Sequence, residues 1–155
     1  MISRRISICY AVSVIDSRWN SLLDRSAQIP IFHTISLEIV ALDDGRATIG
    51  MPYDKRYDGI FQSFHGGLLM TLADTAACLA VLTLAGPDAV ITTTDMNIRF
   101  LAACNSGARA EARVIKFGRT LCPAEVMIRD AAGQEVAIAQ VTYMRLERMP
   151  KRGSR

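Results

Sequence analysis

Apolar and polar residues alternate in two short runs near the middle of the first half of the chain. Apolar side chains recur at every second position over residues 35–41 and again over residues 47–51, which is the period of a half-buried strand. Asp44 and Gly45 lie between the runs, and Asp-Gly is a strong signal for a tight hairpin turn. The pattern therefore predicts a β-hairpin whose buried positions are Ile35, Leu37, Ile39, Ala41, Ala47, Ile49 and Met51.

A long apolar run follows, after a polar loop over residues 53–64. Residues 68–85 are almost all apolar or small, with Gly66 and Gly67 before them and Gly86-Pro87 after them. Gly and Pro at these places are typical of helix ends, and a helix that is apolar all round is enclosed by other elements. The length approaches the ~20 residues of a membrane span. Asp74 at its centre would be costly in lipid, so we predict a buried helix of a soluble protein.

Further alternation predicts strands over residues 91–101, 107–117, 120–130 and 135–147, the last two joined by a turn at Gly133. Pro123 cannot donate a ladder hydrogen bond and indicates an edge position or a bulge. The order is thus a hairpin, one long helix and then antiparallel strands. A single helix enclosed by one curved antiparallel sheet, an α+β architecture, satisfies this order.

The two ends of the chain are set apart from this domain. We expect an arm or a short helix in residues 1–28, the folded domain in residues 29–147 and a basic tail in residues 148–155. The first residues, MISRRISICYAVSVIDSRWN, have the arginines and the apolar run of a signal peptide. The run is short, however, and is followed by charged residues rather than by a small-residue cleavage site. A signal peptide is therefore not favoured.

Composition narrows the class of protein. The 155 residues fit one domain, and 50% hydrophobic with 21% charged residues is typical of globular proteins. The net charge of +3 comes largely from the two chain ends, where basic residues are not interleaved with aromatics, so a nucleic-acid partner is not expected. The four cysteines lack CxxC spacing, which disfavours a zinc site. A reducing, cytoplasmic setting fits them best.

Asp74 is the residue whose presence in this apolar helix most needs an explanation. A buried, unpaired carboxylate is unfavourable and normally finds hydrogen-bond donors or changes its pKa. Three interpretations are open: Asp74 braces neighbouring backbone, it lies on a narrow solvent stripe with Thr71 and Thr75, or it lines a pocket as a nucleophile or general base.

The start of the same helix favours the third interpretation. The first N–H groups of a helix have no internal partner and lie at the positive end of its dipole. Gly66 and Gly67 would let a ligand approach these groups closely. The helix start is therefore a candidate oxyanion hole for a carbonyl oxygen that gains charge during a reaction.

Distance separates the two candidate groups. Gly66 and Asp74 are eight residues apart, which is about 12 Å along a helix. Groups that act on one carbonyl must lie within about 3 Å of it or of the attacking water. Two antiparallel copies of the helix across a two-fold axis could bring Gly66 of one chain to Asp74 of the other. If the segment is catalytic, we therefore expect a dimer with two composite sites.

The segment HGGLLMTLADTAA, residues 65–77, resembles the central-helix motif of hotdog-fold acyl-CoA thioesterases of the phenylacetyl-CoA thioesterase (PaaI-like) type. TTTDMNIRFLAAC resembles the strand that follows this helix in the family, and VIKFGRTLCPAEVMIRDAAGQEVAIAQVTYM resembles its last three strands. The resemblance covers roughly residues 30–147. It implies a hotdog fold, a homodimer or homotetramer, and hydrolysis of acyl-CoA to free acid and CoA without a metal or a redox cofactor.

The resemblance also implies roles for particular residues. The N–H of Gly66 would polarise the thioester carbonyl, with His65 and Gly67 shaping the helix start. Asp74 of the partner subunit would be the nucleophile or the base that activates water. Thr93, on the next strand, would hold the water or the carboxylate.

Substrate-binding residues are implied less directly. In the family, coenzyme A lies between subunits with basic residues near its phosphates, and Arg99, Lys116 and Arg119 are the candidates here. Family members often carry Asn or Gln six residues before the His, where this chain has Gly59. Asp58 and Gln62 are the nearest polar residues to that position.

Other functions on the same fold stay open. A non-catalytic acyl-CoA-binding protein is one alternative, and the missing polar residue at position 59 favours it. A hydratase or dehydratase is another, although the HxxxPG-like loop of acyl-carrier-protein dehydratases is absent. Thioester hydrolysis accounts best for Asp74. The acyl group is not specified, and an acyl pocket could be lined by the loop aromatics Tyr53, Tyr57, Phe61 and Phe64.

Overall fold

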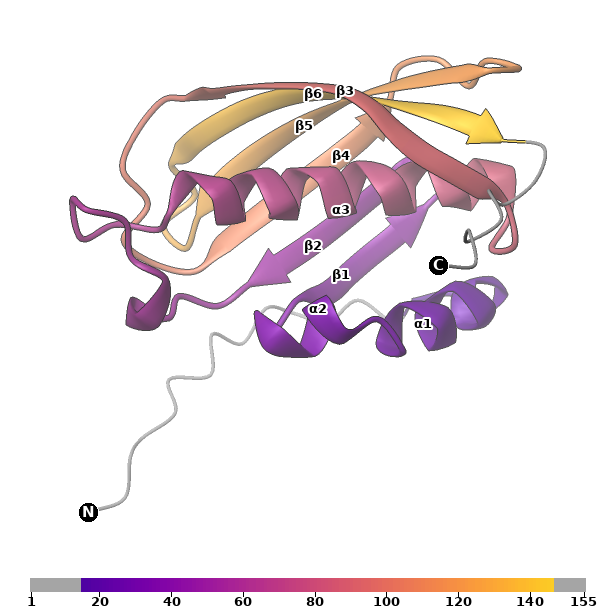
Figure 1. Ribbon diagram of the computed structural model, residues 1–155. Helices are drawn as coiled ribbons and strands as arrows, with labels where there is room; N and C mark the ends of the chain where they lie inside the picture. The colour runs from indigo at the N-terminus through magenta and orange to yellow at the C-terminus, as the bar shows by residue number, and fades with distance from the viewer. Residues whose placement is uncertain (1–14, 147–155) are drawn as a thin grey trace, which may run out of the picture.

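One antiparallel sheet of six strands curves around a long helix in the computed structural model of the protein, which describes residues 15–146 (Figure 1). The strands are β1 (Glu38–Asp43), β2 (Arg46–Met51), β3 (Val90–Phe100), β4 (Ala108–Val114), β5 (Leu121–Asp130) and β6 (Glu135–Leu146). Their order across the sheet is β1-β2-β4-β5-β6-β3. The predicted α+β hotdog architecture is confirmed.

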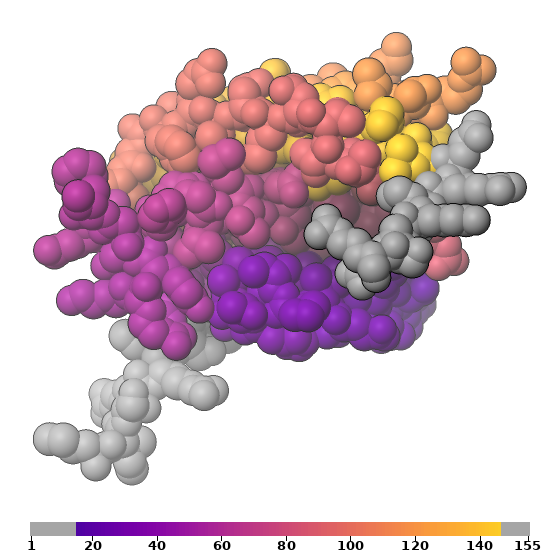
Figure 2. Space-filling model, viewed as in Figure 1, coloured from indigo at the N-terminus to yellow at the C-terminus, as the bar shows by residue number. Residues whose placement is uncertain are grey.

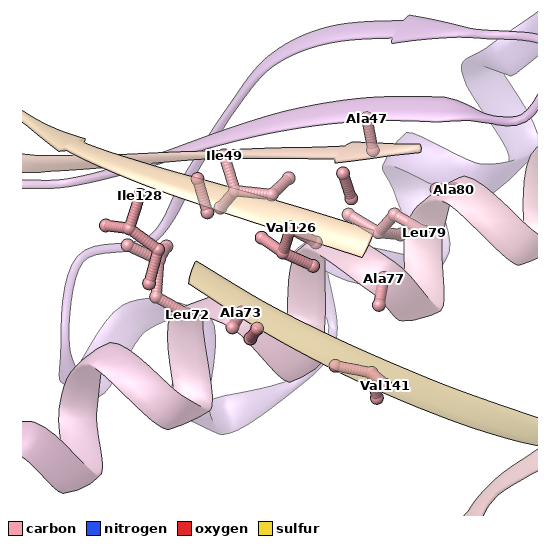
Figure 3. Close-up of a cluster of buried hydrophobic side chains, with 14 of the residues drawn as sticks. Ala47, Ile49, Leu72, Ala73, Ala77, Leu79, Ala80, Val126, Ile128 and Val141 are labelled. Carbon is pink, nitrogen blue, oxygen red and sulfur yellow. The ribbon is translucent and has the colours of Figure 1, made fainter. Parts of the chain in front are cut away.

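The central helix, α3 (Gly66–Ala85), is 20 residues long and ends at Gly86, whose φ of 94° suits glycine. Of the described helices, α3 alone is long and apolar enough to cross a membrane. One face of it is buried in the core, whereas Met70 and Leu84 are exposed, so the predicted enclosure holds for one face of the helix only. Figure 3 shows Leu72, Ala73 and Ala77 of α3 among side chains from the strands. Small residues on both sides let the helix approach the sheet closely. The fully or nearly fully buried alanines are Ala47, Ala73, Ala76, Ala77, Ala80, Ala108, Ala110, Ala112, Ala124, Ala137 and Ala139.

The β1–β2 hairpin turns at Gly45 (φ 70°), as the Asp-Gly signal predicts. Ala47, Ile49 and Met51 are buried on β2 as expected. The pattern predicted for β1 is wrong after Leu37, because a bulge between Ile39 and Ala41 shifts the register. An extra residue reverses the direction of the side chains that follow. Val40 and Leu42 are therefore the buried residues of β1.

Pro123 lies in a strand with neighbours on both sides, so of its two predicted settings, an edge position or a bulge, the edge position is wrong. It pairs with Thr142 of β6, and its carbonyl accepts a hydrogen bond from the N–H of Ile115, just after β4 ends. In an antiparallel strand, the N and the C=O of one residue point to the same side. The missing N–H of Pro123 thus points to the place where β4 has ended, which is why proline is tolerated there.

The N-terminal segment is helical, which is one of the two predicted possibilities. It contains a short 3₁₀ turn, η1 (Ser17–Trp19), α1 (Asn20–Ala27) and an unexpected second helix, α2 (Pro30–Thr34). Pro30 occupies the first turn of α2, where its missing N–H is harmless. Trp19, Leu22 and Phe32 belong to the same buried cluster as α3 and the sheet. The expected N-terminal arm over residues 1–14 and the basic tail lie outside the described residues.

Thr83 joins the end of α3 to the β1–β2 turn. Its buried hydroxyl donates to the carbonyl of Ala80 at 2.7 Å and accepts from the N–H of Gly45 at 2.8 Å. Thr83→Val keeps the shape but leaves the Gly45 N–H buried without a partner. We expect it to lower the free energy of unfolding by about 1–3 kcal/mol.

Chemical denaturation of Thr83→Val beside Thr48→Val tests this expectation. Thr48 lies half-buried on β2, and its side chain makes no hydrogen bond to another described residue. The control therefore makes the same chemical change without removing such a bond. Equal stability losses in the two variants would contradict the role assigned to Thr83.

Candidate active site

The carboxylate of Asp74 is held by two hydroxyl groups from the sheet. Thr93 of β3 donates to Asp74 Oδ1 at 2.9 Å, and Tyr143 of β6 donates to the same oxygen at 2.7 Å. The Tyr143 hydroxyl also lies 3.0 Å from the Asp74 main-chain carbonyl. Thr93 and Tyr143 face each other across the β3–β6 ladder, so the sheet presents both donors to one side of α3.

Tyr143 was not found by sequence reasoning. Burial raises its pKa above the ordinary value, and the nearby Cys78 and Asp74 raise it further. The hydroxyl is therefore protonated at neutral pH and acts as a donor. Tyr143 occupies one of the alternating apolar positions of β6, as a core residue would. The sequence pattern therefore did not indicate this role.

Asp74 has one carboxylate oxygen left for a ligand. Oδ1 receives both hydroxyl bonds, whereas Oδ2 accepts none from the residues that the structure describes. The side chain is half-buried. Its partners are side chains rather than backbone N–H groups. Thr71 and Thr75, half-buried like Asp74, bond the helix carbonyls of Gly67 and Thr71. Of the three interpretations, the geometry matches a carboxylate that lines a pocket.

That pocket lies between the N-terminal helices and the central helix. Its volume is about 330 Å³, and Asp74 and Tyr143 lie in its lining together with residues of α1, α2, α3 and the start of β3. Figure 2 shows the indigo surface of α1 and α2 directly against the surface of the later elements. The loop aromatics Tyr53, Tyr57, Phe61 and Phe64, which were expected as candidates to line an acyl pocket, are not among the residues of this one.

Cys78 also lines the pocket, one turn after Asp74. Burial raises the pKa of its thiol to about 11, although the Tyr143 hydroxyl opposes part of that shift. The thiolate is the nucleophilic form of cysteine, so Cys78 is protonated and unreactive near neutral pH. Asp74 is the stronger candidate for the reacting group.

The start of α3 is capped by His65. Its Nδ1 accepts a hydrogen bond from the N–H of Gly67 at 3.0 Å, which satisfies one of the free donors of the helix. The N–H of Gly66 donates to no other described residue. A Cβ at Gly66 would lie 2.9 Å from the ring of Phe100, and one at Gly67 would lie 3.1 Å from His65 Nδ1. A side chain at Gly66 would therefore displace the exposed Phe100 ring, and one at Gly67 would press on the capping His65 ring.

The loop before the helix places Gly59 beside His65. A Cβ at position 59 would lie 3.9 Å from His65 Cδ2, which is an ordinary contact. The position that holds Asn or Gln in the resembled family thus lies at the helix start here, with room for a side chain. Asp58 is instead engaged by the Tyr53 hydroxyl at 2.7 Å. Gln62 is exposed, with a left-handed φ of 55°.

The three basic candidates lie apart from the helix start. Arg99 pairs with Ile138, and both side chains are on the outer face of the sheet, away from α3. Lys116 and Arg119 lie exposed in the β4–β5 connection, close to the place where Val114 bonds Gly45. Gly45 contacts the end of α3, so this connection and Gly66 lie at opposite ends of the helix.

The structure therefore forms two groups from the predicted residues rather than one site. Asp74 and Thr93 meet with Tyr143, and His65, Gly66 and Gly67 form the helix start. Asp74 and Gly66 belong to one straight helix, about 12 Å apart along its axis. His65 and Asp74 share no hydrogen bond.

Comparison with known proteins places the chain in a family. The family model of the thioesterase superfamily matches residues 61–137. A proposed esterase of Saccharolobus solfataricus is 30% identical over 106 residues, which cover 67% of this chain and 74% of that protein. A 1,4-dihydroxy-2-naphthoyl-CoA hydrolase of Listeria monocytogenes is 27% identical over 110 residues, 70% of this chain and 89% of that one. The chain belongs to the thioesterase superfamily, and these relatives support a hydrolase.

Solved structures agree on the fold. A thioesterase family protein of Silicibacter pomeroyi has a TM-score of 0.77 at 28% identity, covering 83% of this chain and 98% of that one. The PaaI protein of E. coli has the same TM-score at 22% identity, covering 83% and 93%; at that identity the likeness shows the fold alone. The resemblance to PaaI-like hotdog thioesterases is confirmed.

The His65 cap yields a prediction about stability. His65→Ala removes the acceptor for the Gly67 N–H and should lower the free energy of unfolding by about 1 kcal/mol. His65→Asn offers a side-chain oxygen to the same donor and should recover most of the loss. Thermal and urea denaturation of both variants measure this. If the Asn and Ala variants are equally destabilised, His65 does not act as a cap.

Proposed function

We propose that this protein hydrolyses acyl-CoA thioesters at two composite sites, each formed by Asp74 of one chain and Gly66 of another. The observation that carries the proposal is the Asp74 carboxylate, fixed through Oδ1 by Thr93 and Tyr143 with Oδ2 directed to no described residue. A carboxylate held in this way is positioned for a reaction rather than merely tolerated. Membership of the thioesterase superfamily supports the reaction class.

The chemistry needs a base or nucleophile and a place for negative charge. As a base, Asp74 takes a proton from water while the water oxygen bonds to the thioester carbonyl carbon. As a nucleophile, its oxygen forms that bond itself and water then hydrolyses the mixed anhydride. In both cases the carbonyl oxygen becomes an oxyanion that the Gly66 N–H stabilises. The tetrahedral intermediate then collapses and the C–S bond breaks. In the base route the leaving sulfur takes the proton that Asp74 accepted, and in the nucleophile route CoA leaves as the thiolate, which takes a proton from water.

A second chain would bring the Gly66 N–H and the Asp74 carboxylate together. The helix start bears an apolar surface: Ile60 and Phe61 are each 89% exposed, and Phe100 and Leu101 are about half exposed. Exposed apolar groups of this kind mark contact surfaces. β3 is also the sheet's outer strand next to Asp74, bonded only to β6 among the described strands. These features support a homodimer with antiparallel central helices, or a tetramer made of two such dimers.

Other parts of the proposal follow from the family resemblance. Arg99, Lys116 and Arg119 are proposed to meet the phosphates of coenzyme A, Arg99 from the outer sheet face and the other two from the far end of α3. Gly67, Gln62 and Asp58 are proposed to shape the entrance near the thioester. We propose that the reaction uses no metal or redox cofactor, and that the protein works in the cytoplasm without nucleic-acid or membrane partners. Among residues 15–146, no three His, Cys, Asp or Glu side chains gather as metal ligands.

Asp74→Asn tests the proposed activity. The substitution preserves side-chain size but removes the charge, and thiol release from a panel of acyl-CoAs should fall by about 10²-fold or more. Thermal unfolding of the variant shows whether the fold is intact. A wild-type protein that binds acyl-CoA without cleaving any member of the panel would instead be a non-catalytic acyl-CoA-binding protein.

Gly66→Pro tests the oxyanion role with a matched control. Proline at the first helical position removes the N–H that the proposal uses without breaking a hydrogen bond inside the helix. Gly66→Ala adds a Cβ that meets Phe100 in the same way but keeps the N–H. We expect kcat for Gly66→Pro to be lower than for Gly66→Ala by about 10²-fold. Equal rates in the two variants would remove Gly66 from the mechanism.

A further inference from the structure

We propose that the cavity between α1–α2 and α3 holds the acyl group of the substrate and selects unsubstituted apolar acyl groups of medium length or with a single ring. This inference rests on the proposed thioester hydrolysis and adds the substrate class. It also gives α1 and α2 a function, since these two helices form one wall of the cavity.

The cavity is continuous with the candidate reacting group. Asp74 and Tyr143 belong to its lining, so an acyl group whose carbonyl lies at Asp74 has this space directly beside it. The remaining wall is mainly apolar, with side chains from α1, α2, α3, their connections and β3; it includes Leu22, Ile29, Ile31, Phe32, Leu79, Leu82 and Ile91. A chain of methylene groups or a benzene ring would bury its surface against this wall.

The hydroxyl groups of the lining already donate their protons. Ser26 donates to the carbonyl of Leu22 and Thr75 to that of Thr71. Arg25, which is exposed, donates to the carbonyl of Pro87. A carboxylate at the end of the acyl group would therefore lose its water without meeting a free buried donor, which is unfavourable. The cavity thus favours an acyl group that ends in a methyl or an unsubstituted ring.

The size of the cavity sets the length of the acyl group. A volume of about 330 Å³ is near the lower end of the roughly 300–1,000 Å³ found for small-molecule sites. It suits a medium chain or one ring, whereas a long fatty chain would extend beyond it.

Ile31→Trp, with Ile138→Trp as its control, tests the assignment. The two isoleucines are matched in exposure, at 40% and 41%, but only Ile31 lines the cavity, because Ile138 lies on the outer face of the sheet. Rates are measured with acetyl-CoA, octanoyl-CoA and suberyl-CoA, whose acyl group has eight carbons and a terminal carboxylate. Ile29→Trp, at a second exposed position of the wall, replaces Ile31→Trp if the latter does not fold.

Wild-type protein should have a higher kcat/KM for octanoyl-CoA than for either acetyl-CoA or suberyl-CoA. Ile31→Trp should lower the octanoyl value by about tenfold or more and leave the acetyl value within about twofold, because only the longer group reaches the wall. Ile138→Trp should change neither value.

Three results would overturn the inference while leaving thioester hydrolysis in place. These are an equal or greater rate with suberyl-CoA, equal losses for acetyl and octanoyl substrates in Ile31→Trp, and no loss for either. If wild-type protein cleaves none of the thioesters, the proposed function fails instead. Calorimetric measurement of acyl-CoA binding then tests whether the cavity holds the acyl group. Tighter binding of octanoyl-CoA than of acetyl-CoA, weakened by Ile31→Trp, supports the inference. The absence of this preference overturns it.

Discussion

Close packing of α3 on the concave face of the sheet is the contact on which the rest of the structure depends. Alanines at the interface, among them Ala73 and Ala77 on the helix and Ala110 on β4, bring backbone close to backbone. The helix is consequently fixed along its whole length. Two features that chemistry needs, an N-terminal glycine with a free N–H and a carboxylate beside a cavity, are held at set positions by this contact.

The same rigidity creates the central constraint on function. Because α3 is one continuous helix, Gly66 and Asp74 cannot act on the same carbonyl within one chain. The sheet completes the Asp74 end by presenting Thr93 and Tyr143, and the N-terminal helices enclose the space beside it. The Gly66 end is left open and surrounded by exposed apolar side chains such as Phe61. In the proposed mechanism one chain therefore supplies two half-sites, which is the reason for proposing a dimer.

Features encoded by local sequence were predictable, and features made by long-range contacts were not. The extent of α3 and the hairpin turn at Gly45 follow from runs of neighbouring residues, and Asp74 was singled out as the one charge within such a run. Tyr143 lies 69 residues from Asp74, and its position on an alternating strand is that of any core residue. The bulge near Val40 was not predicted because a bulge leaves the local composition unchanged. The short helix α2 also depends on tertiary packing. The cavity was not predicted because its walls come from segments far apart in the sequence, which meet only through tertiary packing.

Mixing two inactive variants tests the composite site most directly. Chains carrying Asp74→Asn and chains carrying Gly66→Pro are unfolded together, refolded at equal concentration and assayed for thioester hydrolysis. A mixed dimer contains one site with both native groups, so random pairing should restore about a quarter of the wild-type rate. Activity no higher than that of the separate variants, in a sample shown by differential labelling to contain mixed dimers, would contradict the account.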